Sequence, residues 1–185
     1  MDDGMFWAVA MAAAVLVGMA KGGLPVVGML GVPVLSLVVS PVTAAGLLLP
    51  VLVVSDAFGL YAYRHAFDGR VFVIMGSGAT IGVGLGWATA SVVQEWMVTL
   101  MVGLIGFVFA LNLLVRKLAV VEPRQAEPAP GIFWGIIAGF TSFVSHTGGP
   151  PFQVYALRLG MSKTVFAGTS TILFAYINAI KLVPY

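Results

Sequence analysis

The sequence predicts an all-α fold, a polytopic bundle of transmembrane helices. Of its 185 residues, 60% are hydrophobic and only 9% are charged, whereas soluble domains carry about 25% charged residues. Most of the apolar runs extend over 16 to 22 residues, which suits membrane-spanning helices, and they lack the alternation of barrel strands. No basic segment precedes the first run, so we expect no cleaved signal peptide and a first helix that stays in the mature protein.

The apolar segments follow one another along the chain with short polar interruptions. They are Met5–Ala20, Val26–Val39, Val42–Tyr63, Val71–Ala90, Trp96–Val115, Gly131–Ser145 and Thr164–Val183. Pro33 interrupts the second segment. Residues 116–130 form the one polar stretch with several prolines, which is typical of a linker.

Glycine and proline interrupt the helices at two places. The first break is Lys21-Gly22-Gly23-Leu24-Pro25 and the second is His146-Thr147-Gly148-Gly149-Pro150-Pro151. A break leaves N–H groups without partners at the start of the next half-helix, where the helix dipole favours an anion. Glycine lets a ligand approach the backbone, and proline suits the first helical turn. We therefore predict the substrate site at the two breaks.

The two breaks are related by a weak internal repeat. A shift of 126 residues carries Gly22-Gly23 onto Gly148-Gly149, and after a short deletion a shift of 122 carries Asp56 onto Asn178. Repeats built around interrupted helices are a recurrent transporter design, with the substrate site at the breaks.

The repeat predicts how the chain is divided. We expect a first membrane repeat at 1–118, a polar linker at 119–130 and a partial second membrane repeat at 131–185. The last two spans of the first repeat have no counterpart in the second. Either the sequence is a fragment of a longer chain, or a partner protein supplies the two missing spans. We favour the fragment.

Basic residues predict the orientation, because they favour the cytoplasmic side of short loops. This rule places the loops with Arg64, Arg70, Arg116, Lys117 and Arg124 inside the cell. If the short segments after the breaks cross the membrane, the repeats are inverted; if these segments re-enter, the repeats are parallel. The distribution of basic residues favours inversion. The short second segment argues against it, since it would extend only about 10 Å in a core of roughly 30 Å.

Four ionisable residues lie inside apolar stretches, where a charge costs at least about 2.5–3.5 kcal/mol, so each is a functional candidate. Lys21, beside Gly22, Gly23 and Pro25, would add a positive charge to an anion site, or its side chain could extend to the lipid headgroups. The polar pair matched by the repeat, Asp56 and Asn178, would bind substrate or backbone, or form only a contact between helices. The other two ionisable residues in apolar stretches are His146 and Lys181.

His146 lies at the second break with Thr147, Gly148, Gly149 and Pro150, which we include in the predicted binding site. It is either a hydrogen-bonded structural residue or a proton carrier, since its unperturbed pKa is near 6.5. The sequence has no cysteine and no cluster of histidines or acids at ligand spacing. We therefore expect no metal, no cofactor, no nucleic-acid partner and no catalytic residue.

The chain resembles the TauE/SafE family of membrane transporters, the sulfite and organosulfonate exporter group. The resemblance lies in residues 18–25, 32–35, 44–50, 56, 63–64, 139–152, 166–169 and 178–185. It includes the first break in Gly18-Met-Ala-Lys-Gly-Gly-Leu-Pro25 and the second in Ser145-His-Thr-Gly-Gly-Pro-Pro151. The resemblance implies a multi-pass protein of the bacterial inner (plasma) membrane that exports or imports small anions, often sulfur-containing. Family members usually continue for some 60 further residues.

The residues and the resemblance together favour transport of a small anion, such as sulfite, an organosulfonate or a carboxylate, by alternating access at the paired breaks. The expected partners are the lipid bilayer and the anion. Coupling to a proton or another ion and formation of a homo-oligomer stay open. The alternatives are an accessory membrane subunit without transport activity and an anion channel; an enzyme is not expected.

Overall fold

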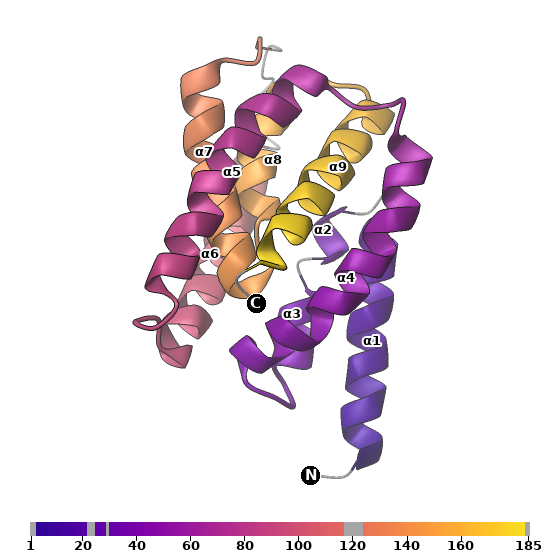
Figure 1. Ribbon diagram of the computed structural model, residues 1–185, viewed down its shortest axis with the longest axis vertical. Coiled ribbons are helices and arrows are strands. Elements are labelled where there is room, and N and C mark those ends of the chain that lie inside the picture. Colours follow the sequence, from indigo (N-terminus) through magenta and orange to yellow (C-terminus); the bar gives the residue numbers. More distant parts are fainter. Residues whose placement is uncertain (1–2, 22–24, 29, 117–123, 184–185) are drawn as a thin grey trace.

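The computed structural model describes residues 3–21, 25–28, 30–116 and 124–183. Its elements are α1 (Asp3–Lys21), α2 (Pro25–Gly28), α3 (Gly31–Leu35), α4 (Pro41–Tyr63), α5 (Gly69–Thr89), α6 (Glu95–Arg116), α7 (Pro128–Ser145), α8 (Gly149–Ala156) and α9 (Lys163–Lys181). No strand occurs among these residues. The all-α prediction is confirmed (Figure 1).

Within the described part of the chain, three helices are long and apolar enough to cross a membrane, namely α4, α5 and α7. Shorter apolar stretches occupy Gly4–Ala20 and Trp96–Val108. Length and composition therefore support a multi-pass membrane protein, as the hydropathy of the sequence predicts.

Short polar side chains and prolines define where the long helices begin. The Ser40 and Asp68 side chains accept hydrogen bonds from the Thr43 and Val71 amides at the starts of α4 and α5, which satisfies N–H groups that the helix cannot. Proline at the first turn lets α7 begin at Pro128, earlier than the predicted Gly131. The chain is thus helical over the last residues of the predicted linker.

The apolar core is divided into two clusters. One joins α1, α3 and α4 through residues such as Val17, Leu35 and Leu48. The other joins α5, α7, α8 and α9 through residues such as Met75 and Phe152. We call α1–α4 the N-terminal body, and α5 with α7–α9 the C-terminal body. Helix α4 of the first packs beside α9 of the second.

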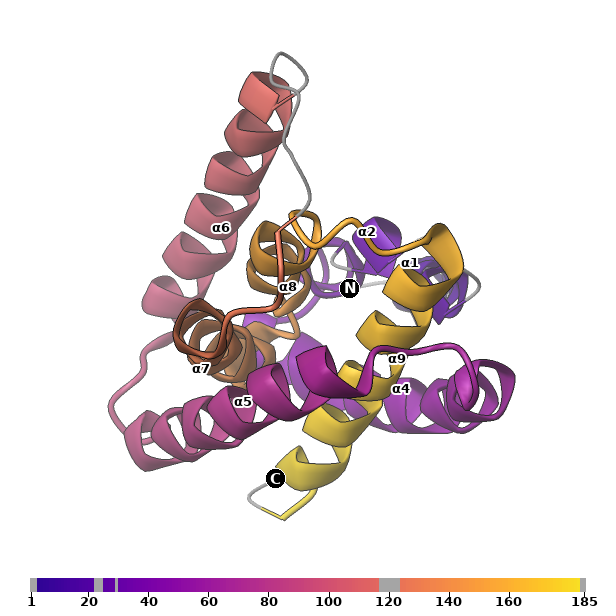
Figure 2. The same ribbon diagram turned by 90° about the horizontal axis from the view of Figure 1, so that it is seen from above.

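Helix α6 leans away from both bodies (Figure 2). Its large apolar side chains are exposed at Trp96, Leu100, Leu104, Phe107, Leu111 and Leu114. Lipid tails would cover such a surface in a bilayer, because the hydrophobic effect does not penalise apolar side chains there.

Helices α5 and α7 make direct backbone contact through glycine. A Cβ atom on Gly82 would collide with the Ile136 carbonyl, and one on Gly139 would collide with the Ala79 carbonyl. Small residues that allow such an approach are the usual means by which membrane helices pack closely. Gly78 and Gly82 thus hold α5 to α7, a helix from the other half of the chain.

The helices that correspond in the two halves of the chain run in opposite directions (Figure 1). In Figure 1, α1 and α4 rise from the end of the molecule where the N-terminus lies, whereas α7 and α9 descend toward it. The α4–α5 connection, the residues before α7 and the α8–α9 connection all lie at the upper end. There the Arg124 amide donates a 2.8 Å hydrogen bond to the Arg158 carbonyl.

The glycine contact predicts a position-specific effect of one methyl group. Gly82→Ala should lower the free energy of unfolding in detergent micelles by about 1–3 kcal/mol relative to Gly84→Ala, because the new methyl group must push two backbones apart. Gly84 is a matched control: it lies in the same helix and has open space beside it, so helix propensity changes equally in both variants. Equal unfolding curves for the two variants, followed by circular dichroism, would contradict the assignment.

Candidate functional site

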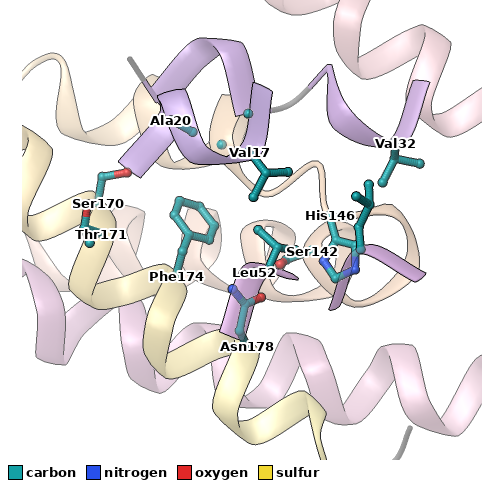
Figure 3. A pocket seen from close by; sticks show the side chains of 13 residues that line it. Val17, Ala20, Val32, Leu52, Ser142, His146, Ser170, Thr171, Phe174 and Asn178 are labelled. Carbon is teal, nitrogen blue, oxygen red and sulfur yellow. The ribbon is translucent and has the colours of Figure 1, made fainter. Parts of the chain in front are cut away.

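A cavity of about 80 Å³ lies between the N-terminal and C-terminal bodies (Figure 3). One water needs roughly 10–15 Å³ of such space, so several waters or one small anion would fit. The lining residues are Val17, Ala20, Gly28, Val32, Leu48, Leu52, Ser142, His146, Gly149, Ser170, Thr171, Phe174 and Asn178. Among the described lining residues, those from the N-terminal body are all apolar, and the polar ones come from the C-terminal body.

Both helix breaks border this cavity. Ala20 and Gly28 line it on the two sides of the first break, and His146 and Gly149 line it at the second. Of the residues predicted for the first break, Gly22 and Gly23 lie outside the described residues. Lys21 ends α1 and Pro25 begins α2, but their side chains are also outside the described part of the structure.

At the second break, α8 offers the cavity fewer amides than a typical helix start. Pro150 and Pro151 have no N–H group, and the Phe152 amide donates to the Gly148 carbonyl. This leaves the Gly149 amide, which has no backbone acceptor among the described residues. A Cβ atom on Gly149 would meet no atom within 4 Å, so a ligand can approach the backbone there.

His146 ends α7 in the left-handed conformation, with φ 54° and ψ 23°. It is the one non-glycine residue with positive φ in the described chain, in a position where glycine is usual. Its Nε2 atom lies 2.8 Å from the Ala45 carbonyl of α4. The ring therefore connects the two bodies, which offsets the backbone strain of roughly 1–3 kcal/mol.

Lys181 lies behind His146 and is completely buried. Its Nζ atom donates to the Ser142 carbonyl at 2.9 Å and to the Ser142 hydroxyl at 3.2 Å, and lies 2.7 Å from His146 Nδ1. An ammonium group only donates hydrogen bonds and cannot accept one. Nδ1 must then be the acceptor, so Nε2 carries the imidazole hydrogen and donates it to Ala45.

The repeat-related pair Asp56 and Asn178 is in direct contact. Asn178 Nδ2 donates a 2.7 Å hydrogen bond to Asp56 Oδ2, and both side chains are buried. Asn178 also lines the cavity, so Asp56 reaches the site through Asn178. The bond joins α4 to α9, and it links the two bodies as the bond from His146 to Ala45 does.

The remaining predicted residues at the second break face the protein. The Thr147 hydroxyl is 2.7 Å from the Ser145 hydroxyl, and Pro150 is buried beside it at the start of α8. A Cβ atom on Gly148 would lie 2.7 Å from the Ala138 carbonyl. Gly148 thus lets α8 pack on α7.

One face of α9 supplies site residues that the sequence analysis missed. Ser170, Thr171 and Phe174 line the cavity together with Asn178. The hydroxyls of Ser170 and Thr171 make no hydrogen bond to the described residues, whereas helical hydroxyls commonly bond to the preceding turn. In the sequence, Thr171, Phe174, Asn178 and Lys181 are spaced three or four residues apart. This spacing places them on one face of a helix and could have indicated that Thr171 and Phe174 share the site with Asn178.

One of the comparisons with known proteins identifies the family. The family model described as "Sulfite exporter TauE/SafE" matches residues 8–185. The chain belongs to the TauE/SafE family. No significant match was found among curated proteins or among solved structures. As a TauE/SafE protein the chain is a membrane transporter of the sulfite-exporter type, and the resemblance noted in the sequence is confirmed.

The cavity of this TauE/SafE chain is chemically suited to an anion. It presents hydroxyl donors from Ser142, Ser170 and Thr171, and the amide of Gly149, and none of its described lining residues is acidic. Among the described residues, no group of three histidines or acids could hold a metal ion. Hydrogen-bond donors in a water-poor site are the usual means of binding a small oxyanion.

The Asp56–Asn178 contact can be measured with a double-mutant cycle. Asp56→Ala and Asn178→Ala should show a coupling free energy of about 0.6–1.7 kcal/mol, the range for hydrogen bonds between membrane helices. Unfolding in mixed micelles, followed by circular dichroism, would provide the four stabilities. Additive effects of the two substitutions would mean that the bond does not hold α4 to α9.

Proposed function

We propose that the chain is an exporter or permease that carries small anions such as sulfite, organosulfonates or carboxylates across the bacterial inner membrane and binds them in the cavity between the two bodies. The cavity carries this proposal: donors from α7, α8 and α9 that have no acceptor among the described residues face it, opposite apolar side chains of the N-terminal body. A donor-lined site inside an otherwise apolar bundle suits an anion that must leave water.

We infer that transport uses alternating access, with the N-terminal body moving against the C-terminal body. The cavity and both polar links lie at the junction of the bodies, and the α4–α5 connection is the covalent link between them. Because α5 packs on α7, the moving units would be these bodies rather than the predicted repeats at 1–118 and 131–185. Transporters of this kind rock around a fixed site at the interface.

The arrangement of the helices supports an inverted repeat. Corresponding helices run in opposite directions, α1 against α7 and α4 against α9 (Figure 1). Asp56 and Asn178, which the repeat makes equivalent, bond to each other. Equivalent positions meet in this way beside a two-fold axis. The segments after both breaks would then cross the membrane.

The same arrangement supports the orientation. The connections that carry Arg64, Arg124 and Arg158 lie together at the end opposite the N-terminus (Figure 1). Placing basic loops in the cytoplasm puts the N-terminus in the periplasm.

Filling the cavity should stop transport. Gly149→Leu would place its side chain in the open space beside Gly149, and we expect the rate of radiolabelled sulfite flux into proteoliposomes to fall at least about tenfold. Gly84→Leu is the matched control, since Gly84 also has open space beside it but lies outside the cavity lining. Equal flux in both variants would refute this site. No flux in the wild type would favour an accessory subunit, and flux that never saturates would favour a channel.

The prediction for Lys21 can be tested in the same proteoliposomes. Lys21→Ala should raise the KM for sulfite at least about tenfold if the ammonium faces the anion, whereas Lys21→Arg should retain most of the affinity. A side chain that only extends to the headgroups would give unchanged KM values in both variants.

A further inference from the structure

The polar side chains that line the cavity form what we call its polar wall: Ser142, His146, Ser170, Thr171 and Asn178. Lys181 is buried behind this wall. We propose that Lys181 is the residue that makes the cavity select anions over neutral molecules, by polarising the Ser142 hydroxyl that faces the ligand. This inference rests on the proposed function and assigns a residue to its charge selectivity. Lys181 is not part of the cavity lining, so it would act through Ser142 as a positioning residue.

The hydrogen-bond pattern gives the Ser142 hydroxyl one direction in which to donate. Lys181 Nζ donates to Ser142 Oγ, so the oxygen is already an acceptor. Its hydrogen has no acceptor among the described residues, and Ser142 lines the cavity. An oxygen that accepts from an ammonium becomes a stronger donor, because linked hydrogen bonds polarise one another. The hydroxyl is therefore an activated donor aimed at the ligand.

The position of the ammonium is fixed by the fold. It is held by the Ser142 carbonyl in the last turn of α7 and by His146 Nδ1. The carbonyls at a helix C-terminus carry partial negative charge, which stabilises a cation there. The left-handed conformation of His146 keeps its ring between Lys181 and Ala45. The ammonium charge is thus held in a buried place, where its electrostatic interaction with a ligand is strong because the effective dielectric constant is low.

Asp56 is the acid connected to the same polar wall, through Asn178. Asn178 and Lys181 are one helical turn apart on α9, so the two charges act on one cavity with opposite signs. Removing Lys181 should weaken the preference for an anion, whereas removing the charge of Asp56 should not.

A pair of ligands of the same shape would test this role. Methanesulfonate carries one negative charge, and dimethyl sulfone is its neutral analogue. Their dissociation constants would be measured by calorimetry on the purified full chain in detergent. The wild type should bind methanesulfonate more tightly, and Lys181→Met should reduce that preference roughly ten- to a hundredfold, as a lost unit charge a few ångströms away implies. Lys181→Arg should retain the preference.

Several outcomes separate this role from a structural one. A merely structural lysine would change the affinity for both ligands equally, so an unchanged ratio in a folded Lys181→Met protein would overturn the proposal. A lower preference for methanesulfonate in Asp56→Asn as well as in Lys181→Met would also overturn the proposal. Any change in the polar wall would then lower the preference, whatever the charge of the residue that is replaced. If Lys181→Met does not fold, Ser142→Ala tests the same step. That variant should lower the ratio, and an unchanged ratio would refute the role of the hydroxyl.

Failure of the proposed function would look different. A wild type that binds neither ligand nor sulfite would contradict the anion site itself. A wild type that prefers methanesulfonate, with a preference that Lys181→Met retains, would contradict only the role of Lys181.

Discussion

The constraint on which this structure depends is that a polar group in a lipid bilayer must find its partner inside the protein. Polar side chains are therefore concentrated at the junction between two apolar clusters, where Asn178 binds Asp56 and His146 links Lys181 to the Ala45 carbonyl. The same bonds hold the bodies together and leave donors facing the cavity between them. Stability and ligand binding thus use one set of groups.

The glycine contact between α5 and α7 complements this junction. It is a backbone-to-backbone contact without polar side chains, and it makes α5 part of the C-terminal body. One interface of the molecule is thus tight and apolar, whereas the other is polar and encloses a cavity. A tight apolar interface favours rigid movement of a unit, while an interface of a few hydrogen bonds can open at a cost of about 1 kcal/mol for each bond.

Much of this could be predicted from the sequence. Hydropathy and proline placed the helices and both breaks, because length and backbone chemistry determine them locally. The repeat paired Asp56 with Asn178 before their contact was visible. The other features depend on tertiary packing. Ser170 and Thr171 are common residue types in a helix, and they become part of the site only because the N-terminal body encloses a cavity against their face of α9. Thr147 and Gly148 face the protein because His146 adopts the left-handed backbone conformation and changes the direction of the chain. The residue types at a helix break do not predict that conformation.

The distance along the chain between Asp56 and Asn178 has a consequence for biosynthesis. The two residues are 122 positions apart, so at roughly 5–20 residues per second translation places about 6–24 s between them. During that interval α4 must enter the membrane with its carboxyl group before Asn178 exists, at an insertion cost of up to about 3.5 kcal/mol. The apolar residues of α4 have to offset this cost alone. The long hydrophobic span from Pro41 to Tyr63 is therefore a requirement of the order of synthesis as well as of the finished fold.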